Sequence, residues 1–101
     1  MRPILIALFL LLTAPPLHAE EDFRPLPLHE AARLVAERYQ GRLLAARLTP
    51  PTRHERDLGV ELVTELRLLT PARNLLAIRL DARNGRFLDV AGVGQTEALK
   101  R

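Results

Sequence analysis

Hydrophobic residues recur along this chain with two different periods, and the change of period separates one helix from a set of strands. Between residues 28 and 40, the apolar residues keep the three- and four-residue spacing of one helix face: Leu28, Ala32, Val35 and Tyr39. Gly41 follows at a position that is typical of a helix end. No Ser, Thr, Asp or Asn stands at the start of this segment, so we expect a poorly capped first turn.

After Gly41, apolar and polar residues alternate, which is the period of a strand that is buried on one face. The pattern predicts four strands, over residues 42–48, 58–69, 74–80 and 86–90. The side chains expected to face inward are Leu44, Ala46, Leu48, Leu58, Val60, Leu62, Leu66, Leu68, Leu76, Ile78 and Leu80. A proline-broken loop over residues 49–57 joins the first two strands.

The order of these elements predicts an α+β fold, with one N-terminal helix packed on a small antiparallel sheet of three to four strands. Residues 20–27 contain two prolines and are expected to form an extended lead-in, and residues 91–101 to form a flexible tail. Asp81, Asn84 and Gly85 are assigned to the turn between the last two strands, because Asn-Gly is a strong hairpin signal and Gly85 is expected to have a positive φ.

The first nineteen residues have the order of a secretory signal peptide. Arg2 gives a positive start, the run 4–12 is wholly apolar, and Ala19 ends a short segment that suits cleavage. Spanning a bilayer takes roughly 20 apolar residues, and this run is about half as long. We therefore expect a signal peptide over 1–19 and a periplasmic or secreted mature chain, with an uncleaved anchor as the alternative.

Composition narrows the classes of function. The 101 residues include 15 Arg or Lys and 12 Asp or Glu, and neither Cys nor Ser is present. Disulfides, Cys metal sites and the commonest nucleophiles are therefore excluded. The bases are not clustered and aromatic residues are few, so nucleic acid is not expected as a partner, although weak contact with an anionic envelope surface stays open.

Candidate catalytic and metal sites are incomplete. His29-Glu30 is followed by Arg33 at the position where a zinc peptidase motif needs its second His, and His54 stands alone in the predicted loop. Glu61 and Glu65 would lie roughly 13 Å apart along a strand, which is too far for a paired-carboxylate site. The sequence predicts a protein that is not an enzyme and that has no cofactor.

The chain resembles a PepSY domain from about Leu28 to Val90. The resemblance rests on the segments 28–32 (Leu-His-Glu-Ala-Ala), 41–44 (Gly-Arg-Leu-Leu) and 78–88, in which a strand, Asp-Ala, two residues, Gly and a short apolar strand follow one another. The Pro-Pro loop after residue 49 departs from the family pattern. The resemblance implies an extracytoplasmic module without catalytic residues that restrains peptidases or regulates envelope proteins.

These expectations favour a non-catalytic binding module that inhibits or modulates a peptidase or the outer domain of a sensor. The alternative is a structural or envelope-surface protein without a specific regulatory target. The outward face of the predicted sheet mixes apolar area with both signs of charge, as partner surfaces often do. The residues expected to form this partner surface are Arg47, Glu61, Val63, Glu65, Arg67 and Arg79.

Overall fold

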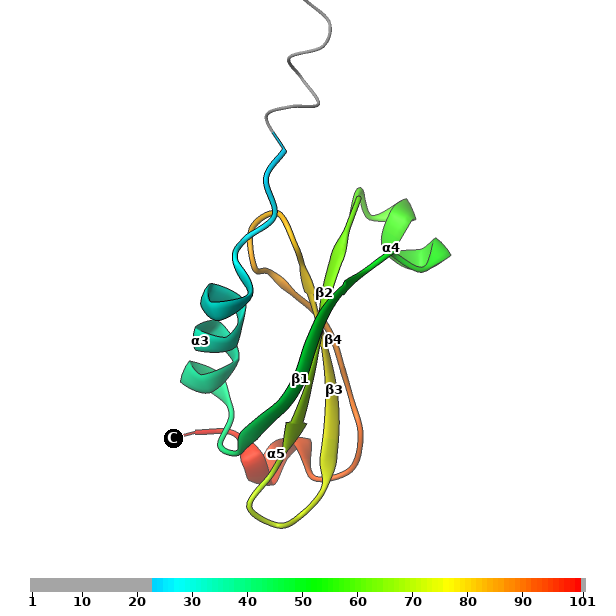
Figure 1. Ribbon diagram of the computed structural model, residues 1–101. Coiled ribbons are helices and arrows are strands. Elements are labelled where there is room, and N and C mark those ends of the chain that lie inside the picture. Colours follow the sequence, from blue (N-terminus) through cyan, green and yellow to red (C-terminus); the bar gives the residue numbers. More distant parts are fainter. Residues whose placement is uncertain (1–22, 101) are drawn as a thin grey trace, which may run out of the picture.

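The computed structural model describes residues 23–100, in which one helix packs against a four-stranded antiparallel sheet and two short helices complete the fold (Figure 1). In chain order the elements are α3 (Leu28–Arg38), β1 (Arg42–Thr49), α4 (Arg53–Asp57), β2 (Val63–Leu69), β3 (Leu75–Asp81), β4 (Phe87–Ala91) and α5 (Gln95–Ala98). The predicted α+β class is confirmed. The expected signal peptide over 1–19 lies outside the described residues, and no helix within 23–100 is long and apolar enough to cross a bilayer.

Helix α3 supplies one side of the core. Ala31 and Val35 are buried, and Tyr39 is buried directly after the helix. The helix ends at Arg38, two residues before its predicted end, because Tyr39 adopts an extended conformation and forms a β-bridge with Leu99. At the other end Pro27 occupies the N-cap position and no side chain caps the helix.

The strands pair in the order of the chain, β1-β2-β3-β4, so each is joined to the next by a simple antiparallel connection. The face of the sheet toward α3 is apolar, and its central side chains have almost no exposed surface: Leu66, Leu68, Leu76, Ile78 and Leu80. All five belong to the set that alternation predicts to face inward, because the two-residue period follows the pleat of β2 and β3 closely.

Strand β1 departs from its predicted orientation at its start. The pairing with β2 shifts between Leu43 and Ala45, so that Leu43 is opposite Leu68 and packs against the core. Leu44, predicted to face inward, is 49% exposed. An extra residue in one strand of a pair reverses the faces on one side of the irregularity, and alternation in the sequence does not reveal where this happens.

The second strand is shorter than predicted, since the chain enters β2 only at Val63. The preceding segment, predicted as a loop, contains helix α4 over residues 53–57. Leu58, predicted to face inward, is instead 56% exposed. A capping box begins α4: the Glu55 amide donates to Thr52 Oγ1 over 3.1 Å, and the Thr52 amide donates to Glu55 Oε1 over 2.8 Å. This pair of bonds satisfies two amide groups that a helix start otherwise leaves free.

The segment after β4 is packed on the fold rather than loose as predicted. Residues 95–98 form α5, and Ala98 is buried. The Gln40 amide donates to the Ala98 carbonyl over 2.7 Å, and the Lys100 amide donates to the Arg38 carbonyl over 2.9 Å. These bonds hold the segment against the end of α3.

Candidate functional site

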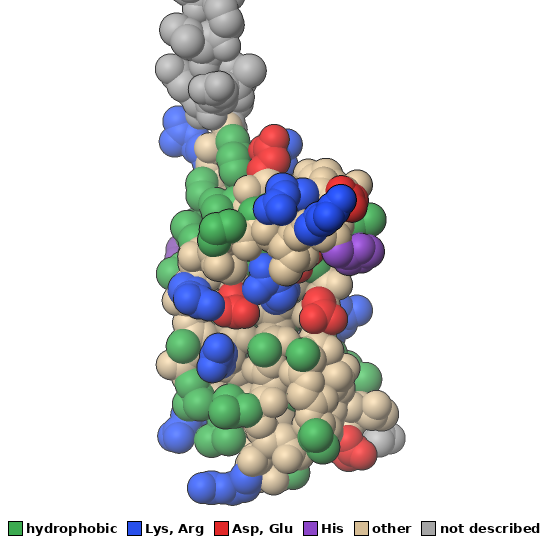
Figure 2. Space-filling model, turned by 90° about the vertical axis from the view of Figure 1, so that its right-hand side faces the viewer, with side chains coloured by type: hydrophobic (Ala, Val, Ile, Leu, Met, Phe, Trp, Pro, Cys, Tyr) green, Lys and Arg blue, Asp and Glu red, His purple; other side chains and the backbone are tan. Residues whose placement is uncertain are grey.

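The face of the sheet that points away from α3, here called the outer face, carries a row of charged side chains. Arg47 of β1 is opposite Glu65 of β2, which is opposite Arg79 of β3, which in turn is opposite Asp89 of β4. The sign of charge therefore alternates from strand to strand. Figure 2 looks toward this side of the molecule and shows positive and negative side chains gathered across its middle.

Glu65 joins its two neighbours in this row. Arg47 Nε donates to Glu65 Oε1 over 3.0 Å, and Arg79 Nη1 donates to Glu65 Oε2 over 3.1 Å. Each carboxylate oxygen thus receives one guanidinium group. Opposite charges on directly paired strand residues stabilise a sheet by a few tenths of a kcal/mol to about 1 kcal/mol.

Helix α4 adds a second carboxylate, Glu55, which bonds to Arg79 of the charged row. Arg79 Nε donates to Glu55 Oε2 over 2.8 Å, and Arg79 Nη2 donates to Glu55 Oε1 over 2.9 Å, so the pair is bidentate. The side chains of Glu55 and Arg79 are only 6% and 16% exposed. The pair fixes α4 to the sheet, because a bidentate bond restricts both distance and orientation.

The electrostatics of this cluster favour the charged forms of Glu55, Glu65 and Arg79. The hydrogen bonds from Arg79 lower the pKa of Glu55 to about 2, against the opposing effect of burial. The hydrogen bond from Arg47 likewise lowers the pKa of Glu65. The bonds to Glu55 raise the pKa of Arg79 above its usual value. Glu55, Glu65 and Arg79 are thus fixed charges near neutral pH.

Next to the charged row lies a flatter row of small residues around one free base. Ala45, Arg67, Ala77 and Ala91 are opposite one another across the four strands. Arg67 is exposed and makes no ion pair with the other described residues. A shallow depression of about 300 Å³ lies between Ala45, Arg67 and the charged row. The surface is open to a partner and too shallow to enclose a small molecule.

The structure brings four of the six predicted surface residues together on the outer face: Arg47, Glu65, Arg67 and Arg79. Glu61 precedes β2 and pairs instead with Arg83 of the β3–β4 turn. Val63 belongs to the outer face by register, yet it is 0% exposed. It is the first residue of β2 and lies between Thr49 of β1 and Asp81 of β3. The expectation that Val63 forms part of an exposed surface is therefore corrected.

Of the three predicted turn residues, Asp81 ends β3, and Asn84 and Gly85 lie in the connection to β4. Asp81 Oδ1 accepts a bond from the Arg83 amide, and Asn84 Oδ1 accepts one from the Arg86 amide, both over 2.9 Å. Gly85 has a φ of +79°, and a Cβ there would collide with a methyl group of Leu34. This glycine therefore serves both the turn and its close approach to α3.

Sequence reasoning missed Glu55, which it placed in an open loop. The spacing Thr52-x-x-Glu55 is the signature of a capping box and predicts the short helix. Its pairing with Arg79, 24 residues later in the chain, has no comparable signal, because only the folded sheet brings the two side chains together.

Among the described residues, the fold does not complete the zinc motif that begins at His29-Glu30. Within residues 23–100, no three His, Cys, Asp or Glu side chains come together as metal ligands. Arg33, which stands where the zinc motif needs its second His, bonds to Glu30 and Glu37 on the surface of α3. Comparisons of the whole chain with protein-family models, with curated proteins and with solved structures found no match.

Proposed function

We propose that this chain is a non-catalytic periplasmic binding module that inhibits or modulates a peptidase or an envelope sensor protein. The partner docks on the outer face of the sheet, over the small-residue row and the neighbouring charges. The observation that carries this proposal is the fixed charged row, in which Glu55 and Glu65 hold Arg79 in one position. Side chains that are already ordered lose little entropy on binding, and alternating charge favours a partner of matching pattern.

Two further observations support the proposal. The helix followed by a four-stranded meander is the arrangement that the PepSY resemblance implies for residues 28–90. The outer face also keeps exposed apolar area beside its charges, including Leu75, which is 52% exposed. A structural protein bound to the envelope surface is the second candidate, and the exposed arginines Arg47 and Arg67 favour it.

The test is photo-crosslinking of the full 101-residue chain in an envelope extract, with the reactive amino acid at position 77. Ala77 lies on the outer face beside Arg67, so a docked partner comes within reach. The matched control carries the same amino acid at position 29, because His29 is exposed on α3. Mass spectrometry identifies the products.

We expect one dominant peptidase or sensor protein from position 77 and not from position 29, and we expect Arg67→Glu to reduce its yield. The captured peptidase then serves in an inhibition assay with the unmodified chain. Diffuse labelling of lipid and abundant proteins from both positions contradicts the proposal and favours the envelope-surface protein. Val63 and Arg79 are left unchanged in this test, because Val63 is buried and Arg79 holds Glu55 and Glu65, so substitutions there would disturb the fold itself.

A further inference from the structure

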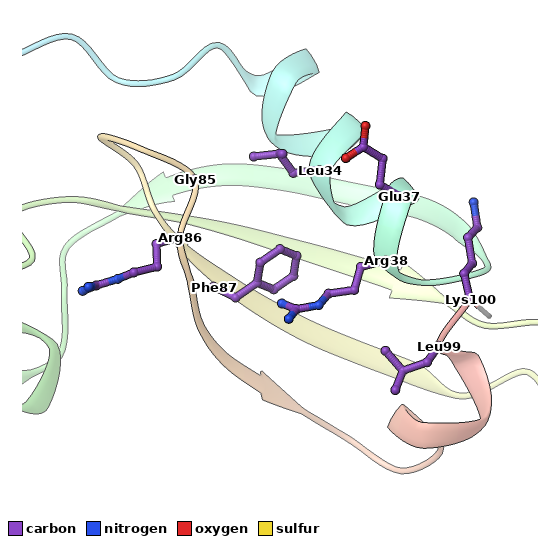
Figure 3. A pocket seen from close by; sticks show the side chains of 8 residues that line it. All are labelled: Leu34, Glu37, Arg38, Gly85, Arg86, Phe87, Leu99 and Lys100. Atoms are coloured by element: carbon purple, nitrogen blue, oxygen red, sulfur yellow. The ribbon is translucent and has the colours of Figure 1, made fainter.

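Helix α3 covers only part of the inner face of the sheet. Among the strands, its backbone lies nearest to β1 and β2. A helix with its side chains is about 10 Å wide and strands are about 4.8 Å apart, so one helix shields roughly two of four strands. Phe87 and Val90 of β4 are only partly buried and pack at the margin of the core, and a groove remains between α3 and this strand (Figure 3).

The groove has a volume of about 740 Å³ and is open along one side. Its apolar surface comes from three parts of the chain: Leu34 of α3, Phe87 of β4 and Leu99 after α5. The Arg38 guanidinium lies 4.2 Å from the centre of the Phe87 ring. Figure 3 shows Arg38 and Phe87 side by side beneath the helix, with Leu99 close to them.

The charge of the groove is unbalanced toward positive. Arg38, Arg86 and Lys100 line it and form no ion pair with any residue in 23–100. Its one carboxylate, Glu37, is already paired with Arg33. In Figure 3, Lys100 stands at the rim and Arg86 extends away along the hairpin, so Arg38 and Lys100 are the bases nearest to the apolar surface.

Strand β4 adds main-chain donors and acceptors to this surface. It is the last strand of the sheet and pairs only with β3, so the groups along its other edge have no strand partner among the described residues. An extended peptide can add to such an edge, and its alternate side chains then point to the inner face. A lipid offers no equivalent row of hydrogen-bonding groups.

We propose that the groove beside β4 binds an extended acidic peptide segment. The segment pairs with the free edge of β4, places an apolar side chain against Phe87 and Leu99, and places a carboxylate near Arg38 and Lys100. This site lies on the opposite side of the sheet from the outer face, and its role in regulation rests on the proposed function. The occupant is an exposed strand or tail of a protein partner.

The probe is a fluorescent hexapeptide, Thr-Leu-Thr-Glu-Thr-Leu, titrated into the full chain and followed by anisotropy and by amide chemical shifts. The probe is one residue longer than the five residues of β4, and its leucines and glutamate share one face. We expect saturable binding with shifts in residues 87–91 and in the last turn of α3. The same peptide with lysine in place of glutamate should bind roughly tenfold more weakly or worse.

Two variants keep the test independent of folding. Arg38→Glu and Lys100→Glu should each weaken binding by roughly tenfold, whereas Arg53→Glu on α4 should leave it unchanged. Lys100 is an exposed rim residue, so its variant remains informative if Arg38→Glu lowers the thermal midpoint. Equal binding of both peptides, or no saturable binding, overturns the proposal.

Phosphatidylglycerol vesicles separate a peptide site from a membrane site. In one contrary outcome the unmodified chain binds the vesicles and not the peptide, with Arg38→Glu and Lys100→Glu each abolishing vesicle binding. That outcome overturns the proposal and favours a lipid surface. Crosslinking from position 77 is independent of both variants. A partner captured there while the peptide fails to bind leaves the proposed function intact and removes only the groove site.

Discussion

Thr64 places a buried hydroxyl group on the inner face of the sheet, among apolar strand neighbours. It lies between Leu48 and Leu80 in register and is 1% exposed. Its Oγ1 has no hydrogen-bond partner among the described residues. A buried hydroxyl without a partner costs about 1–3 kcal/mol, because its bonds to water are lost and not replaced.

Replacing this residue with the apolar residue of the same shape should stabilise the protein. We expect Thr64→Val to raise the free energy of unfolding by about 1 kcal/mol, because the methyl group needs no partner and valine suits a strand. Urea unfolding of the full chain measures the change. Thr96→Val on the exposed face of α5 is the control and should have little effect. A destabilised Thr64→Val protein would show that the hydroxyl has a bonding partner.

At this scale the sequence predicts the fully paired residues well and the ends of strands poorly. Leu66, Leu76 and Ile78 face inward as expected, because the pleat of a regular strand has a period of two. Leu44 and Val63 differ from expectation for separate reasons. A bulge turns Leu44 outward, and Val63 is buried although its register places it on the outer face. Both depend on contacts between distant segments.

The stability of the short helix α4 comes mainly from an ion pair to the sheet, because its own backbone hydrogen bonds are few. A helix of five residues has too few backbone hydrogen bonds to be stable alone. The capping box and the Arg79–Glu55 pair supply the additional stabilisation. The pKa of Glu55 is lowered to about 2 from an ordinary value of 4.5. A carboxylate with a lowered pKa in the folded state stabilises the protein above its unfolded pKa, and this stability is lost as the pH falls through the folded pKa.

The free energy of unfolding should therefore fall as the pH is lowered from about 4.5 to 2. We expect Glu55 to contribute about 2–3 kcal/mol to the loss between pH 7 and pH 2.5. Urea unfolding at both values should show a smaller loss in Glu55→Gln, which is already destabilised at pH 7. Glu61→Gln is the matched control, because its pair with Arg83 is exposed and contributes below about 1 kcal/mol. The same pH dependence in wild type and Glu55→Gln would contradict this role.

Element types were predicted correctly where a pattern runs for many residues. The period of α3 and the alternation in β2 and β3 each repeat several times, so their positions are clear from the sequence. Helices α4 and α5 have five and four residues, and no period is visible at that length. The candidate site was predicted in part: the outer face follows from alternation, while its closure by Glu55 follows only from the fold.

At the scale of the whole molecule, the segment after β4 packs on the core and joins the end of α3. Ala98 is 3% exposed, and two backbone bonds join this segment to Arg38 and Gln40. The same segment forms one wall of the groove through Leu99 and Lys100. Stability of the core and the shape of the groove are therefore coupled at this end of the fold.

We expect Ala98→Asp to destabilise the protein by about 2–4 kcal/mol, because it forces a carboxylate into the core or detaches α5. Thr96→Asp, two residues away and exposed, should change stability by less than about 0.5 kcal/mol. Urea unfolding measures both variants, and amide exchange of Gln40 reports whether the segment has detached. Equal effects of the two substitutions would show that the segment does not pack on the core.

The charged row across the outer face also influences the register in which the strands pair during folding. The inner face is so rich in leucine that moving β2 by two residues past β1 or β3 still places apolar side chains together. A two-residue shift of β2 in one direction places Arg67 opposite Arg47 and Arg79. A two-residue shift in the other direction places Glu65 opposite Ala45 and Ala77. Like charges directly opposite are unfavourable, and both ion pairs are lost in either case. The charges thus distinguish the correct alignment from near misses that the leucines alone would accept.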